Sequence, residues 1–149
     1  MRNRQPVFCV PGKLAETEKD RNERYITVPA GKPILFAILN WLSVSKGDQE
    51  MIDECKARID VVAREKLKFL ITRDGEEETN RVDIAAIASR LRSDFFMLGK
   101  KRCLTEGYWV MIRPQSAWFA KGVDYTIRSY GSCSSGATQV GIDYHLFVR

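Results

Sequence analysis

The strongest constraint on the fold is a pair of alternating segments at the C-terminal end of the chain. Residues 123–131 (VDYTIRSYG) and 140–149 (VGIDYHLFVR) both carry an apolar side chain at every second position. This two-residue period is typical of strands with one buried face. The run GSCSSG at 131–136 connects them. Two alternating segments joined by a Gly/Ser run predict a β-hairpin.

Further segments carry strand signals. Apolar runs closed by turn residues predict strands in 5–13 and 24–28, and alternation predicts one in 66–75 that ends at an Asp-Gly turn. Aromatic and β-branched residues predict another over 107–114, which proline closes. The continuous apolar run PILFAILNWL at 33–42 is typical of a strand buried on both faces, with a buried helix as the alternative.

One segment has a clear helical period. Within residues 46–66, Met51, Cys55 and Ile59 fall on one apolar stripe, acidic residues crowd the start and basic residues follow. This predicts an amphipathic helix near 48–65, with Cys55 as a small core residue rather than a reactive thiol. Residues 81–100 are ambiguous, and we expect a short helix or turn near 82–88 and a strand over 89–98.

These elements restrict the possible fold classes. A chain of 149 residues is the size of one domain, so residues 1–149 are expected to form a single unit. Many short strands with one good helix predict an α+β domain, mainly antiparallel and sandwich-like. With 44% hydrophobic and 29% charged residues, the chain has the composition of a globular protein rather than a disordered one.

Charge and cysteine usage restrict the chemistry. The net charge of +5 allows phosphate, nucleic acid or anionic sugar as partners without requiring any. The four cysteines, Cys9, Cys55, Cys103 and Cys133, show no CxxC spacing, so no metal site is expected. The sequence has neither a GxxxxGK(S/T) nor a GxGxxG motif, and no cofactor is expected. The start of the sequence lacks a signal-like apolar region, and no run reaches 18 apolar residues. We therefore expect a cytoplasmic protein with free thiols and no membrane segment.

Several motifs resemble those of an uncharacterised family of small, mostly secreted bacterial proteins. The family has a "VFFLAG" strand followed by "VPAGKxLFFPIxN", similar to residues 6–12 and 28–40 here. Its C-terminal part, "DGYWxxxxPLxPGxHTIxFxGS…DVTYHLTV", is similar to residues 107–114, 124–128 and 143–148. A weaker stretch, "DG…yRvxSpxF", is similar to the DG at 74–75 and to SRLRSDFFM at 89–97.

The resemblance covers about half of the chain and implies a mostly β fold. It carries no established activity, so it transfers no catalytic residue. The chain departs from the family at 114–122, where PQSAWFAKG replaces "PLxPG", and at 130–132, where Tyr-Gly-Ser replaces the Gly-Gly-Ser turn. It also lacks the family's leader. A short relative without a secretion signal would suit a mobile gene cassette.

The hairpin contains a candidate catalytic pair. A cysteine nucleophile needs a base, and Cys133 in the connection could use His145, the only histidine. However, a strand rather than a helix follows Cys133, and His145 lies five residues beyond Val140, about 16 Å along a strand. Asp143 shares a strand face with His145 and could orient it. An ordinary hairpin with a partly exposed histidine is the favoured interpretation.

An aromatic and basic patch is the candidate binding site. It consists of Trp109, Trp118, Tyr130, Arg113 and Arg128. Rings beside basic groups can stack on bases or sugars, although core packing or an oligomer interface uses the same residue types. Adjacent residues of a strand face opposite sides, so one of Tyr108 and Trp109 is expected in the core.

These observations favour a binding or interaction module over an enzyme. We expect a small-molecule or carbohydrate ligand at the aromatic and basic patch, and a homo-oligomer. A Cys/His-dependent hydrolase is one alternative. A weak nucleic-acid binder is the other, and it would gather Lys100, Lys101, Arg102, Arg113 and Arg128 on one face. Nucleic acid is the less favoured partner, because the chain has no basic tail.

Overall fold

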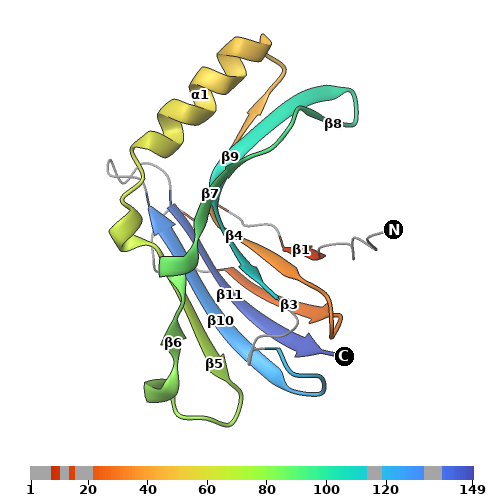
Figure 1. The fold of residues 1–149 in the computed structure, drawn as a ribbon, viewed down its shortest axis with the longest axis vertical. Helices are drawn as coiled ribbons and strands as arrows, with labels where there is room; N and C mark the ends of the chain where they lie inside the picture. The colour runs from red at the N-terminus through yellow and green to blue at the C-terminus, as the bar shows by residue number, and fades with distance from the viewer. Residues whose placement is uncertain (1–7, 11–13, 16–21, 114–118, 133–138) are drawn as a thin grey trace.

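The computed structural model describes residues 8–10, 14–15, 22–113, 119–132 and 139–149, with side chains for 23–113, 119–131 and 141–149. These residues form an α+β sandwich of two mixed sheets and one α-helix (Figure 1). The predicted fold class is therefore confirmed. None of the helices within these ranges is long and apolar enough to span a membrane.

Sheet A has the strand order β1-β4-β9-β7, with β8 also paired to β9. Its strands are β1 (Phe8–Val10), β4 (Ile34–Val44), β7 (Ser89–Arg92), β8 (Phe96–Leu98) and β9 (Lys101–Ile112). All of these pairings are antiparallel except β1 with β4, which is parallel. The long pair β4–β9 forms the centre of the sheet.

Sheet B has the order β2-β11-β10-β5-β6, with β3 also paired to β11. Its strands are β2 (Leu14–Ala15), β3 (Asn22–Val28), β5 (Lys68–Arg73), β6 (Val82–Asp83), β10 (Asp124–Ser132) and β11 (Gln139–Val148). β10 and β11 pair antiparallel from Asp124–Phe147 to Ser132–Gln139, which confirms the predicted hairpin. β3 joins β11 in parallel, a pairing that local sequence does not reveal.

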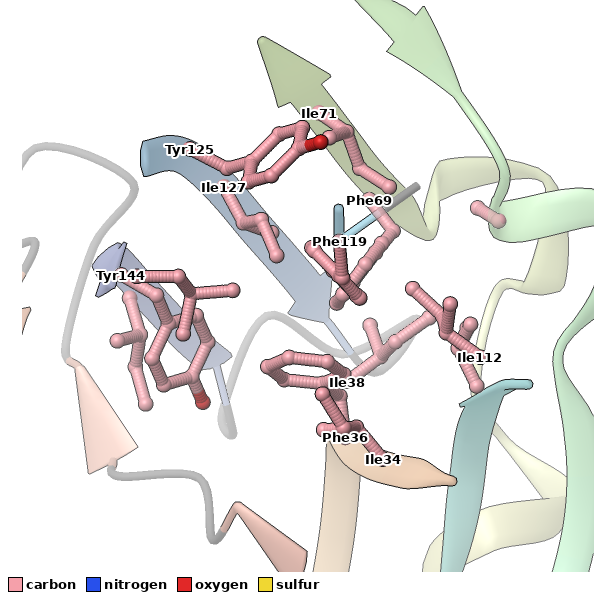
Figure 2. Close-up of a cluster of buried hydrophobic side chains, with 14 of the residues drawn as sticks. Ile34, Phe36, Ile38, Phe69, Ile71, Ile112, Phe119, Tyr125, Ile127 and Tyr144 are labelled. Atoms are coloured by element: carbon pink, nitrogen blue, oxygen red, sulfur yellow. The ribbon is translucent and has the colours of Figure 1, made fainter. Parts of the chain in front are cut away.

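The main core lies between the inner faces of the two sheets (Figure 2). Phe36 of β4 reaches across to sheet B, where its ring lies 5.1 Å from that of Phe69 and 5.5 Å from that of Tyr144. Burial raises the pKa of the Tyr144 hydroxyl to about 12. The alternation of β10 and β11 predicted these inward positions, because successive side chains of a strand face opposite sides.

The helix α1 (Asp48–Asp60) covers the same face of sheet A as sheet B does, but at the other end of β9. Met51 and Cys55 pack against Leu104, and Cys55 donates to the Leu104 carbonyl at 3.6 Å. Burial raises the pKa of the Cys55 thiol, in agreement with its predicted core role. In Figure 1 the helix lies beside the upper part of β9 and sheet B lies below.

Three segments differ from expectation. The helix ends at Asp60 rather than near 65, and a 3₁₀ turn, η1 (Arg64–Lys66), follows it. The expected strand over 89–98 is two strands, β7 and β8, after the 3₁₀ turn η3 (Ala85–Ile87). The strand expected over 107–114 begins at Lys101.

Candidate functional site

The residues of the predicted aromatic and basic patch lie in different parts of the structure. Trp109 is in β9 of sheet A and faces away from the core, whereas its neighbour Tyr108 packs against the core, as expected for one of the pair. Arg128 and Tyr130 lie in β10 on the outward side of sheet B. The structure therefore does not bring Trp109 together with Arg128 on one surface. Arg113 is exposed just beyond β9, and Trp118 lies outside the described residues.

The predicted catalytic pair is described only in part. His145 pairs with Thr126 and lies six residues along β11 from Gln139, about 20 Å at the rise of a strand. Asp143 accepts a hydrogen bond from Arg128 Nε at 3.2 Å. His145 instead stacks on Tyr25 of β3, with ring centroids 4.5 Å apart and an interplanar angle of 14°. Cys133 lies outside the described residues.

The outward side of sheet B forms a regular grid of polar and aromatic side chains. The strand registers align its residues in three rows that run across the strands. Each row contains one residue of β3, one of β11 and one of β10. This surface, called the polar face, consists of Glu23, Tyr25, Thr27, Asp124, Thr126, Arg128, Asp143, His145 and Phe147.

Charges on the polar face are largely paired. Beyond the contact of Arg128 with Asp143, Arg149 Nη1 lies 3.1 Å from Asp124 Oδ1. Glu23 Oε1 lies 3.9 Å from His145 Nε2, too far for a hydrogen bond, and that nitrogen is buried without a hydrogen-bond partner. Tyr25 remains 67% exposed although its ring stacks on His145. The result is a fixed aromatic ring beside paired charges.

The outward side of sheet A has the opposite character. Its outward positions on β4, β7, β8 and β9 are mostly apolar. This surface, called the apolar face, consists of Leu35, Leu42, Val44, Leu91, Phe96, Leu98, Trp109 and Met111. The sequence predicted that the run in β4 is buried on both sides. On the outward side this holds for Ala37, which is buried, but not for Leu42, which is exposed.

A cavity of about 500 Å³ opens beside η1 and η3. It is lined by Arg64, Glu65, Leu67, Asp83, Ala85 and Ala86. Arg64 Nη2 donates to the carbonyls of Ala86 and Ala88 at 3.2 and 2.7 Å, which fixes one wall. Asp83 Oδ1 accepts from the backbone N–H groups of Phe69 and Ala85, so this carboxylate also has a structural task. Trp109, where a ligand pocket was expected, is not among the described residues that line this cavity.

Two buried or half-buried carboxylates hold α1 and β7 in place. Glu54 of α1 accepts hydrogen bonds from Lys46, Ser43 and Trp41, and these bonds lower its pKa to about 2. Glu106 of β9 is buried on the same side of sheet A and pairs with Arg90 of β7 at 2.6 Å. Both arrangements join strands to neighbouring elements, and we assign them to stability rather than to chemistry.

The described residues contain no group of three or more histidine, cysteine or acidic side chains that could hold a metal ion. The two thiols that the structure describes, Cys55 and Cys103, are free and buried. Comparisons with protein-family models, with curated proteins and with solved structures give no match to this chain. Any functional assignment therefore depends on the geometry alone.

Sequence reasoning missed Tyr25 and Glu23 as members of a surface site. A signal was present, since Tyr25 and Thr27 alternate in the strand predicted over 24–28, and Glu23 precedes it with the same two-residue spacing. What the segment could not reveal is the partner of β3. Only the parallel pairing of β3 with β11 puts Tyr25 beside His145.

Proposed function

We propose that the protein is a non-enzymatic binding module that takes a neutral carbohydrate on the polar face. The observation that carries this proposal is the exposed Tyr25 ring, held by its stack on His145. Tyrosine offers a rigid, amphipathic contact surface at a small entropic cost. The C–H groups of a sugar ring can pack on such a surface.

The charged residues around Tyr25 favour a neutral, hydroxyl-rich ligand over an anionic one. Arg128 and Arg149 each have an aspartate partner, so the polar face presents no group of unpaired cations. The carboxylates can accept further hydrogen bonds and the guanidinium groups can donate them. Hydroxyl groups both donate and accept, and thus match this mixture.

Other features support binding over catalysis. Among the described carboxyl groups, those with a resolved pKa shift are Glu54 and Asp60, and hydrogen bonds to cationic neighbours lower the pKa of both. General acid catalysis uses a carboxyl group whose pKa is raised toward neutrality. The hydrolase alternative depends on Cys133, and its test is the activity of Cys133→Ser against model esters.

The nucleic-acid alternative has less support from the positions of the basic residues. Lys100, Lys101 and Arg102 lie around the start of β9 in sheet A, whereas Arg128 lies in sheet B. Arg102 also contacts Asp48 of α1 at 3.0 Å and lies over the ring of Phe95. A single-stranded DNA oligomer is therefore a comparison ligand, and its binding would have to weaken steeply with salt.

The direct test is an NMR titration of the full chain with neutral hexasaccharides: cellohexaose, maltohexaose, xylohexaose and mannohexaose. Resonances of Tyr25 and His145 should move with at least one of them. Tyr25→Ala should weaken that binding about 5- to 150-fold, because it removes a stacking contact of roughly 1–3 kcal/mol. Tyr25→Phe keeps the ring and should bind within about threefold of the natural chain, since only one hydroxyl is lost.

The matched control is Ile87→Ala, which removes an exposed apolar side chain from η3, away from the polar face. It should leave the titration unchanged. Unmoved Tyr25 and His145 resonances with all four sugars would refute the proposal. Equal loss of binding in Tyr25→Ala and Ile87→Ala would refute it as well.

A further inference from the structure

The two outward faces of the sandwich differ in a way that solvent exposure alone does not explain. An antiparallel sheet with one solvated side carries polar residues on that side. Sheet B follows this rule, because its outward positions on β3, β10 and β11 are mainly charged or hydroxyl-bearing. Sheet A breaks it in the same molecule, since its outward positions form the apolar face.

Four of the eight side chains of the apolar face are exposed, and the other four are half-buried. Leu42 is 41%, Leu91 46%, Leu98 53% and Met111 40% exposed, and Trp109 lies half-buried among them. Register places Leu91 opposite Gly107, and Met111 opposite Leu35, so the exposed residues extend over three adjacent strands. The polar residues among them, Asn40 and Thr105, hydrogen-bond to each other at 3.1 Å. Extended apolar surfaces mark interaction sites in folded proteins.

The inner side of sheet A already has its cover. Sheet B packs on Phe36 and Val110 at one end, and α1 packs on Leu104 at the other. Among the described residues, the main contacts of β4 and β9 outside sheet A are with α1 and sheet B, which both lie on the inner side. Yet the run ILFAILNWL in β4 has the composition of a strand that is buried on both sides.

We propose that a second copy of this chain covers the apolar face, so that the protein is a face-to-face homodimer. The face is as long as β4, whose eleven residues span about 36 Å at a rise of about 3.3 Å each. Its width is that of β4 and the neighbouring strands at a spacing of about 4.8 Å, so its area is on the order of 600 Å². Two copies would bury on the order of 1,200 Å², the lower range of specific interfaces.

Charge on this face also has a consequence for the dimer. The outward charged residue of β9 is Lys101 at its start, and Arg113 follows its end. Two-fold packing brings these like charges toward each other at the rim, where salt screens their repulsion. Salt should therefore tighten the dimer. An acidic partner protein would respond in the opposite way, because salt would screen its attraction to the two cations.

The test is sedimentation equilibrium of the full chain, with Met111→Glu as the disrupting variant. The natural chain should sediment at twice its mass of 17.1 kDa. The variant should dissociate at least about tenfold more readily, because it places a charge among the apolar side chains of the interface. Ile87→Glu is the matched control, since it introduces the same charge at an exposed apolar position on η3.

Leu91→Glu repeats the test on the edge strand β7, and circular dichroism with cooperative unfolding shows whether each variant is folded. A folded, monomeric Met111→Glu or Leu91→Glu beside a dimeric Ile87→Glu supports the proposal. A natural chain that stays monomeric at about millimolar concentration overturns it, and so does a dimer that none of the apolar-face variants weakens. Neither result bears on carbohydrate binding, since that site is on the other sheet.

Discussion

At the scale of single residues, Gly107 of β9 lies close against the backbone of β4. The pairing of β4 with β9 shifts register between Ala37 and Leu39, which marks a β-bulge, and Gly107 lies opposite Asn40 just beyond it. A Cβ atom on Gly107 would lie 2.2 Å from the Leu39 carbonyl oxygen and 2.6 Å from Asn40 Cα. The bulge and this glycine therefore depend on each other.

Gly107→Ala should lower the free energy of unfolding by about 2–4 kcal/mol, because backbone atoms of β4 would have to move. Gly47→Ala is the control, since no atom lies within 4 Å of a Cβ placed there. It should change stability by less than about 1 kcal/mol. Urea denaturation of both variants measures the difference. Similar stability of the two variants would show that the strand contact tolerates a methyl group.

Predictions for individual residues succeeded where a local period decides them. The helical stripe predicted that Cys55 is buried, and strand alternation predicted that one of Tyr108 and Trp109 belongs to the core. The predicted patch combined residues from two sheets, because sequence does not show which strands become neighbours. Trp109 is in sheet A and Arg128 is in sheet B. The alternation within each strand cannot show that the two strands belong to different sheets.

At the scale of elements, strands and turns set by neighbouring residues were predictable, whereas those that depend on distant parts of the chain were not. The hairpin β10–β11 was predictable because both strands alternate and are joined by a short connection. The early start of β9 at Lys101 was not, since KRCLTE has no simple alternation. Its buried Glu106 is stabilised by Arg90, a partner sixteen residues earlier in the chain. The position of such a partner follows only from the assembled sheet.

The contact between α1 and β4 gives a prediction for acid pH. Glu54 has a pKa of about 2 in the folded protein, mainly because Lys46 and Ser43 hydrogen-bond its charged form. A depressed carboxyl pKa contributes stability above the unfolded value of about 4.3, and this contribution is lost as pH falls toward 2. At neutral pH, Glu54→Gln should cost about 2 kcal/mol.

The measurement is the free energy of unfolding of the natural chain and of Glu54→Gln between neutral pH and pH 2. The gap between the two proteins should close as the pH falls, because the natural side chain then becomes neutral as well. Asp53→Asn, one residue earlier on the exposed side of α1, is the control and should show a small, nearly constant difference. A gap that stays constant for Glu54→Gln would mean that its charge does not anchor the helix.

At the scale of the whole molecule, the two outward faces assign different tasks to the two sheets. Composition predicted a globular α+β protein, and the apolar run in β4 indicated burial on both sides, but neither identified the cover of the outward side. In the inferred homodimer, the apolar face is covered by a second copy of the chain rather than by another segment of the same chain. The carbohydrate site proposed on the polar face would then remain accessible on both copies.

A face-to-face dimer makes thermal stability depend on protein concentration, because dissociation accompanies unfolding. Each tenfold increase in concentration adds about 1.4 kcal/mol to the dimer, which should raise the midpoint of thermal unfolding by about 2 °C for two chains of 149 residues. Differential scanning calorimetry over two decades of concentration measures this slope. Met111→Glu should remove it and Ile87→Glu should keep it, since only Met111 lies on the apolar face. A midpoint of the natural chain that does not move with concentration would contradict coupled dissociation and unfolding.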